Sequence, residues 1–145
     1  LNDLLKTGGA RTYMIRDSDI SVPYQIRPNI ANEMNADLFV SIHINAYSNS
    51  KINGVETLYC PGDTKASERL AQAVHSAMLE LLDLADRGIW KRTDLVVLRE
   101  TAMPAVMSEV AYITNPDDEK KLLDPDFRQQ VARALYNGLI NYYSN

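Results

Sequence analysis

Apolar residues recur along the chain in two patterns, one typical of strands and one typical of helices. Short runs that are mostly apolar, or that alternate apolar with polar residues, are typical of β-strands. Such runs predict strands at residues 11–16, 38–44, 55–59, 95–98 and 105–112. The run at 38–44 is almost continuously apolar, which indicates a central strand buried on both faces of a sheet.

Apolar residues at spacings of three and four predict the helices. The clearest helix covers residues 64–82, with Thr64 as a candidate N-cap. Further helices are predicted at residues 1–7, 24–34, 117–123 and 126–143. Gly8 and Gly9 end the first helix, and Pro28 predicts a kink in the next one or a helix that begins near it. Residues 84–93 show neither pattern and are expected to be irregular.

The alternation of strands with helices favours an α/β fold. We expect a mostly parallel, twisted sheet with helices on both faces. No repeat, low-complexity tract or linker divides the 145 residues, so we expect one domain at 1–145. Leu1 falls inside a predicted helix and the chain does not begin with Met. We therefore expect an upstream part, and we find no signal peptide in this chain.

Composition narrows the classes of function. The net charge of −4 argues against nucleic acid as the main partner, because binding to its backbone needs clustered Lys and Arg. The single cysteine, Cys60, excludes an internal disulfide and a Cys-rich zinc site, and a small buried apolar role is expected for it. No apolar run reaches the roughly 18–20 residues that a membrane span needs.

Polar side chains interrupt two of the apolar strands. His43 lies near the end of the run at 38–44, and Glu109 lies within the run at 105–112. Burial of an unpaired carboxylate costs several kcal/mol, so such a residue needs a partner, a metal or a catalytic role. A structural hydrogen-bonded histidine, and an ion pair of Glu109 with Arg87 or Arg99, are the alternatives. His75 lies on the predicted helix at 64–82, where a packing or surface role is expected.

Five segments resemble, in the same order, the zinc-dependent N-acetylmuramoyl-L-alanine amidases that act on cell walls. They are TYMIRDSD at 12–19, IANEMNADLFVSIHINA at 30–46, NGVETLYC at 53–60, residues 86–122, which contain SEVAYITN, and FRQQVARALYNGL at 127–139. The resemblance covers essentially the whole chain. It implies an enzyme that cleaves the amide between N-acetylmuramic acid and the L-alanine of the stem peptide.

The resemblance also implies roles for particular residues. His43 corresponds to a ligand of the catalytic zinc ion (Zn2+), and Glu109 corresponds to the acid/base. Asn45 is similar to a small polar residue that lines the site. Arg87 and Arg99 lie in segments that border the cleft, where they are expected to bind substrate. A surface ion pair is the alternative for both arginines. The family has two further zinc ligands, a histidine and a glutamate, upstream of the position where this chain begins.

We therefore expect a monomeric peptidoglycan hydrolase that works outside the cytoplasm, in the cell wall or the periplasm. A non-catalytic amidase-like module that binds peptidoglycan or regulates a partner is one alternative. Another zinc hydrolase on an α/β sheet, such as a carboxypeptidase that acts on stem peptides, is a second. The sequence leaves open the cross-link preference and the physiological role, whether cell separation, sporulation or lysis.

Overall fold

The computed structural model describes residues 1–62 and 65–144, and its centre is one four-stranded sheet. The strands are β1 (Phe39–Asn45), β2 (Val55–Tyr59), β3 (Asp86–Lys91) and β4 (Ala105–Tyr112), in the spatial order β1-β4-β2-β3. β1 is parallel to β4 and β2 is parallel to β3, whereas β2 and β4 are antiparallel. The sheet is therefore mixed but mostly parallel, which confirms the predicted fold class.

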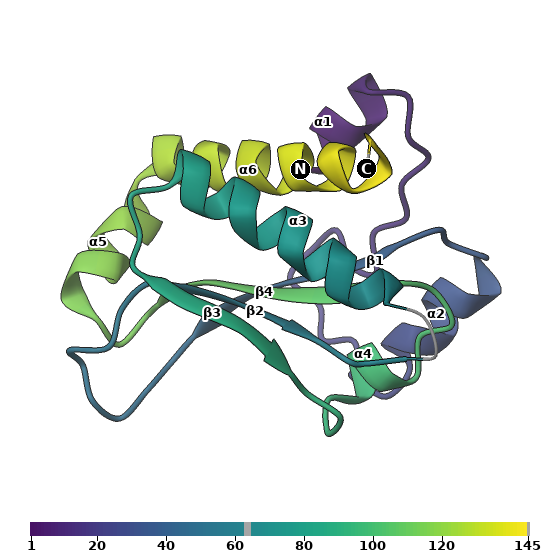
Figure 1. Cartoon of the computed structure of the whole chain (residues 1–145), viewed down its shortest axis with the longest axis horizontal. Helices are drawn as coiled ribbons and strands as arrows, with labels where there is room; N and C mark the ends of the chain where they lie inside the picture. The colour runs from purple at the N-terminus through teal and green to yellow at the C-terminus, as the bar shows by residue number, and fades with distance from the viewer. Residues whose placement is uncertain (63–64, 145) are drawn as a thin grey trace.

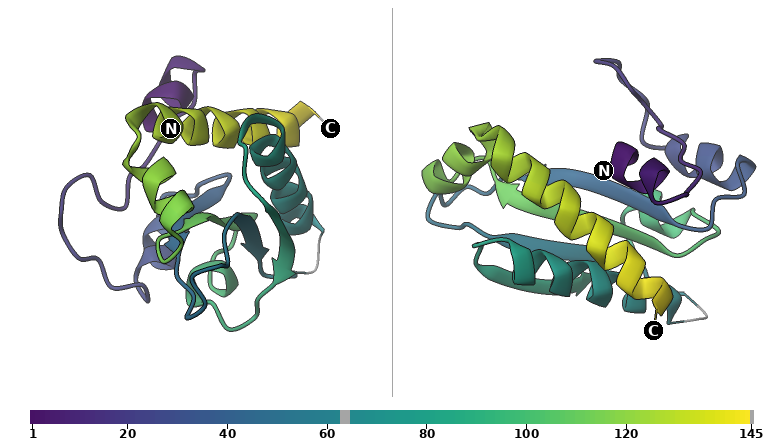
Figure 2. Two further views of the ribbon diagram at one scale, coloured as in Figure 1. Left: turned by 90° about the vertical axis from the view of Figure 1, so that its left-hand side faces the viewer. Right: turned by 90° about the horizontal axis from the view of Figure 1, so that it is seen from above.

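Helices cover both faces of the sheet (Figure 1). The long helices α3 (Ala66–Leu81) and α6 (Pro125–Ser144) lie on one face, and α2 (Arg27–Glu33) and α4 (Val96–Arg99) lie on the other. α5 (Pro116–Leu123) connects β4 to α6, and α1 (Asn2–Thr7) packs beside α6. Figure 2 shows the two long helices crossing the sheet as one layer. No helix in the described ranges combines the length and the apolarity needed to cross a membrane.

Alternation along β4 assigns its side chains to two apolar clusters. Val106 and Val110 belong to the larger cluster, which lies under α3 and α6. Ala105 and Met107 belong to a smaller cluster with residues of α2 and α4. Because successive side chains of a strand point to opposite faces, Glu109 lies on the same face as Met107. The fold thus directs this carboxylate away from the main core.

Two strand predictions are wrong about the edge of the sheet. Residues 11–16 form no strand, and Tyr13 and Met14 are 49% and 58% exposed because the segment has no partner strand in the described structure. β1 was expected to be central and buried on both faces, but within the described ranges it pairs only with β4. Ile42 and Ile44 are accordingly half exposed. Apolar content alone does not determine how many neighbours a strand has.

Two short segments were assigned the wrong type. Residues 84–93 were expected to be irregular but contain β3, in which Gly88 has φ +83° and the register with β2 shifts, so that no simple alternation is visible. Residues 95–98 were expected to form a strand, but α4 begins at Val96. A run of four apolar residues is too short to distinguish the two structures.

The remaining elements agree with the pattern. β2 and β4 have the predicted bounds, α5 and α6 begin at Pro116 and Pro125, and Pro28 lies in the first turn of α2. α3 begins at Ala66 after Lys65, and the predicted cap Thr64 lies outside the described residues.

Two residues singled out in the sequence have structural surroundings. His75 is 4% exposed, which confirms the packing role. Its Nδ1 lies 3.0 Å from Thr57 Oγ1 and its Nε2 lies 2.9 Å from Asp86 Oδ1, so that the ring joins α3 to β2 and β3. Cys60 is only half buried, contrary to expectation, because it follows the end of β2 and packs at the border of the smaller cluster.

Candidate active site

Three ionisable side chains lie next to one another on the α4 face of the sheet. His43 of β1 pairs with Glu109 of β4, and Glu109 pairs in turn with Glu56 of β2. Paired residues on neighbouring strands have their side chains on the same face. The sheet therefore arranges an imidazole and two carboxylates in one row. His43 and Glu109 were predicted from the sequence, whereas Glu56 was not.

Glu109 is a nearly buried carboxylate at the centre of this row. It is 9% exposed, and its Oε2 is buried without a hydrogen-bond partner among the described residues. Burial raises the pKa of Glu109 from 4.5 to about 7, with a further increase from the charge of Glu56 and an opposing effect of Arg92. The group can therefore gain or lose a proton near neutral pH, as a general acid or base must.

His43 lies beside Glu109 and is accessible to solvent. Its Nδ1 is 4.0 Å from Glu109 Oε1, and 40% of its side chain is exposed. Burial, and to a smaller extent the charge of Arg27, lower the pKa of His43 below its usual 6.5. The imidazole is accordingly neutral at pH 7, with a lone pair available for a metal ion.

Glu56 is held by two polar neighbours, one from β1 and one from β4. Asn45 Nδ2 donates to Glu56 Oε1 at 2.6 Å, and Tyr112 also forms a side-chain hydrogen bond with this carboxylate. Burial raises the pKa of Tyr112 to about 12, helped by the charge of Glu56, by this hydrogen bond and weakly by Glu109, and opposed by the charge of Arg87. The phenol therefore stays protonated. Asn45 thus contacts Glu56. The alternation of V-E-T-L-Y, which places Glu56 on the face of Leu58, is the signal that would have revealed this carboxylate.

A second residue that sequence reasoning did not assign to the site is Arg92, just after β3. Its Nε and Nη2 donate to the two carboxylate oxygens of Asp94 at 2.8 and 2.7 Å. Its pKa is raised by the hydrogen bond to Asp94 and, more weakly, by the charges of Glu56 and Glu109. Arg92 therefore lies within electrostatic range of both carboxylates.

The two arginines selected from the sequence lie on either side of Arg92 along the chain. Arg87, at the start of β3, donates from Nε to the carbonyl of Asn53 at 2.6 Å. Arg99, in α4, donates to Glu100 Oε1 at 2.8 Å and to the carbonyl of Thr93 at 3.0 Å. Neither forms an ion pair with Glu109 in the part of the chain that the structure describes. The Arg99–Glu100 pair is exposed, as the alternative interpretation anticipated.

The donor set for a metal ion at this row is partial. A catalytic zinc ion usually has three protein ligands and one open position. His43 fits such a role, since it is neutral, half exposed and next to a buried carboxylate. However, residues 1–62 and 65–144 contain no cluster of three or more His, Cys, Asp or Glu side chains able to hold a metal ion. A zinc site at His43 therefore needs donors other than those described.

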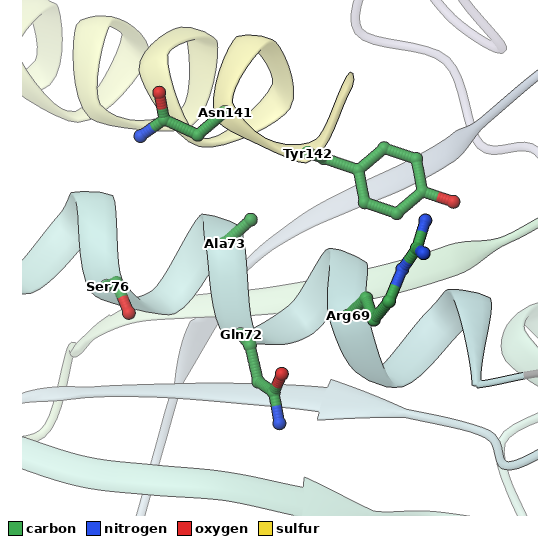
Figure 3. Close-up of a pocket in the computed structure, with 6 residues that line it drawn as sticks. All are labelled: Arg69, Gln72, Ala73, Ser76, Asn141 and Tyr142. Atoms are coloured by element: carbon green, nitrogen blue, oxygen red, sulfur yellow. The ribbon is translucent and has the colours of Figure 1, made fainter. Parts of the chain in front are cut away.

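A separate hollow lies between α3 and α6, on the opposite face of the sheet (Figure 3). It is lined by Arg69, Gln72, Ala73, Ser76, Asn141 and Tyr142. The guanidinium of Arg69 lies 5.4 Å from the centre of the Tyr142 ring, an arrangement that already satisfies both groups. This hollow contains none of the residues of the row.

The family of the chain follows from its sequence and its structure together. The family described as N-acetylmuramoyl-L-alanine amidase matches residues 1–141. The chain belongs to this family.

Curated relatives agree along nearly the whole chain. The chain is 36% identical over 144 residues to the N-acetylmuramoyl-L-alanine amidase LytC of Bacillus subtilis, a match that covers 99% of this chain and 29% of LytC. It is 37% identical over 129 residues to the amidase CwlM of Bacillus licheniformis, covering 89% of this chain and 49% of CwlM. The chain therefore spans less than half the length of these two relatives.

Solved structures agree in fold. The amidase AmiC2 of Nostoc punctiforme superposes with a TM-score of 0.92 at 32% identity, covering 99% of this chain and 78% of that one. The catalytic domain of the amidase CwlV of Bacillus (Paenibacillus) polymyxa superposes with a TM-score of 0.91 at 34% identity, with the same two coverages. The sheet and helices described above are thus those of amidase catalytic domains.

Proposed function

We propose that the chain is the larger part of a catalytic domain that hydrolyses the amide between N-acetylmuramic acid and the L-alanine of peptidoglycan stem peptides. The observation that carries this proposal is the pairing of His43 with Glu109, whose buried Oε2 has no partner among the described residues. Such a carboxylate is costly for a fold that does not use it. Family membership supports the same reaction, and the names of the relatives support a place of action at the cell wall.

We propose zinc as the cofactor, with His43 as one of its ligands. The other ligands would come from outside the described residues, in accord with the greater length of the solved catalytic domains. When bound, zinc supplies Lewis-acid chemistry, which polarises a carbonyl and makes water a stronger nucleophile at neutral pH. Neutral His43 at pH 7 is suited to this role.

Glu109 would move the proton in the reaction. In its ionised form it accepts a proton from the water that attacks the lactyl carbonyl, so that the new carbon–oxygen bond forms without a covalent enzyme intermediate. The protonated Glu109 then donates to the alanine nitrogen as the carbon–nitrogen bond breaks, which releases a free amine. A pKa of about 7 allows both transfers near neutral pH.

The remaining site residues would bind substrate. Asn45 contributes by fixing Glu56 next to Glu109. Arg87 and Arg99 use part of their N–H donors for backbone or side-chain acceptors, and the other donors are suited to a peptide carboxylate or a sugar hydroxyl.

The test is Glu109→Gln in the complete protein, with Glu80→Gln, an exposed change on α3, as the control. We expect Glu109→Gln to retain zinc and to lose at least about a hundredfold in turnover, because one proton carrier is removed. The assay is the release of free alanine amines from purified peptidoglycan, with the glycan strands remaining intact. Near-normal release by Glu109→Gln would show that another group is the base.

A non-catalytic peptidoglycan-binding module is the second candidate function, and the partial donor set favours it. Zinc content and cleavage of the complete protein separate the two candidates. Tight binding of peptidoglycan without zinc and without amine release would support the module.

A further inference from the structure

The end of β3 and the residue that follows it present two large side chains, Trp90 and Arg92, on the face of the sheet that holds Glu109. Trp90 pairs with Leu58, which belongs to the apolar cluster on the α4 face. Trp90 is nevertheless 55% exposed, and its indole N–H donates to the carbonyl of Arg87 at 2.8 Å. Arg92 follows two residues later, and its backbone N–H donates to Tyr59 at 2.8 Å, which continues the β2–β3 ladder.

The guanidinium of Arg92 is held in a fixed orientation. Its Nε and Nη2 form two parallel hydrogen bonds with Asp94, at 2.8 and 2.7 Å, and such a pair fixes the plane of the group. Nη1 donates to no acceptor among the described residues, and 41% of the side chain is exposed. Arg92 therefore has donors available for a ligand that lies across the site.

We propose that Arg92, oriented by Asp94, binds a carboxylate of the peptide part of the substrate, with Trp90 packing against the apolar part of the same segment. This inference rests on the proposed function and adds to it the part of the substrate that is recognised. Neither residue takes part in the proton transfers assigned above. The ligand class is an acidic peptide attached to the scissile amide.

The dimensions of the sheet suggest where that carboxylate lies. Neighbouring strands are about 4.8 Å apart, so β3 lies roughly 10 Å from β4, two strands away. An extended peptide advances about 3.3–3.6 Å per residue. The backbone of Arg92 is also displaced along the strands, since Glu109 pairs with Glu56 and Arg92 follows Lys91, the partner of Tyr59. The guanidinium is nevertheless close enough to Glu109 for the two charges to interact. A carboxylate two or three residues beyond the amide that faces Glu109 would therefore be near the Arg92 guanidinium. The proposed subsite selects stem peptides with an acidic group at this position.

A purely structural role for Arg92 makes a different prediction. If Arg92 served only to balance the charges of Glu56 and Glu109, the carboxylate of a ligand would not influence binding. The test therefore compares two ligands that differ only in this group. One is an N-acetylmuramoyl tripeptide with a free carboxylate on its second residue, and the other is the same tripeptide with this carboxylate converted to the amide.

Trp90 allows binding to be measured without a label. It is the single tryptophan of the chain and is next but one to Arg92, so its emission reports a ligand at the proposed subsite. The titration uses the chain with a chelator present, which prevents turnover, and calorimetry checks each affinity independently. Arg92→Gln removes the charge, and Arg92→Lys keeps the charge without the paired donors. Arg133→Gln, an exposed change on α6, is the control.

We expect the unmodified chain and Arg133→Gln to bind the acid about tenfold more tightly than the amide. Arg92→Gln should bind both ligands with the affinity of the amide, and Arg92→Lys should recover part of the preference. Three outcomes would each overturn the inference. The unmodified chain could bind the two ligands with equal affinity, the preference for the acid could persist in Arg92→Gln, or neither ligand could bind.

The outcome is separable from that of the proposed function. If the complete protein releases alanine amines but the chain binds the acid and the amide with equal affinity, the proposed reaction stands and the proposed subsite is wrong. If the chain binds the acid more tightly through Arg92 but the complete protein releases no amines, the proposed subsite stands and the proposed reaction is wrong.

Discussion

Glu56 and Glu109 lie opposite each other on antiparallel strands, although like charges repel. The two carboxylates have different surroundings, since Glu56 forms hydrogen bonds with Asn45 and Tyr112, whereas Oε2 of Glu109 has no partner in the described structure. Burial, and to a smaller extent the charge of Glu56, raise the pKa of Glu109 to about 7, so Glu109 exchanges its proton near neutral pH. The asymmetry of the surroundings gives the two residues different roles.

The raised pKa of Glu109 predicts a pH dependence of stability in the metal-free chain. Below pH 4.5 the carboxyl is protonated whether the chain is folded or unfolded, so the folded state loses nothing there. Between pH 4.5 and about 7 only the unfolded chain ionises, and the free energy of unfolding falls as the pH rises. Above that range both states are ionised, and the loss stays constant.

Glu109→Gln removes this titration. We expect urea unfolding with a chelator present to show that the variant gains stability relative to the unmodified chain as pH rises from 4.5 to 7, by no more than about 3 kcal/mol. Glu80→Gln should show no such gain, because Glu80 is exposed. A difference between Glu109→Gln and the unmodified chain that does not change with pH would contradict the pKa assigned to Glu109.

At the scale of elements, β2 and β4 have the bounds that their apolar pattern predicts, because most of their apolar residues enter one of two cores. The pattern of β3 is interrupted by Gly88 and by a register shift, and α4 is shorter than the window in which periodicity is visible. The same alternation predicts that Glu109 and Glu56 are on one face, but not that β2 runs antiparallel to β4. Their pairing depends on topology, which local patterns do not contain.

One side chain of α5 connects the two strands that carry these carboxylates. Asp118 is 2% exposed, and its Oδ2 accepts hydrogen bonds at 2.9 Å from the backbone N–H groups of Gly54, just before β2, and Tyr112, at the end of β4. Asn115 accepts from the N–H groups of Asp117 and Asp118 and thereby caps the helix that positions this carboxylate.

We expect Asp118→Ala to lower the free energy of unfolding by about 2–4 kcal/mol, because two buried N–H donors lose their acceptor. Asp118→Asn keeps an oxygen acceptor and should cost less. Asp117→Ala, at the exposed neighbouring position, is the control and should change stability by less than about 1 kcal/mol. Urea unfolding at pH 7 provides the comparison. Equal losses for Asp118→Ala and Asp117→Ala would show that the connection between the strands contributes little.

At the scale of the whole molecule, the sheet separates a packing side from a chemical side. α3 and α6 bury the larger core against one face (Figure 1). The α4 face has a smaller core and holds the row of His43, Glu109 and Glu56, in which Glu109 is nearly buried and the His43 side chain is 40% exposed. β1 forms one edge of the described sheet, with Ile42 and Ile44 half exposed beside His43. The sequence predicted the class of fold and selected His43 and Glu109, which the sheet brings together. It did not predict the edge position of β1, because the neighbours of a strand are not encoded in its own apolar pattern.

The partial donor set predicts weak zinc binding by residues 1–145 alone. A catalytic zinc ion needs about three protein ligands, and the described residues bring no such group together around His43. We expect titration of the chelator-free chain with zinc to show binding weaker than micromolar, and His43→Ala to weaken it further. His75→Gln is the control, since both ring nitrogens of His75 already contact Thr57 and Asp86, and circular dichroism confirms that each variant is folded. If each chain instead binds one zinc ion tightly and His43→Ala abolishes this binding, residues 1–145 contain a full ligand set. The proposal that further ligands lie outside the described residues would then be wrong.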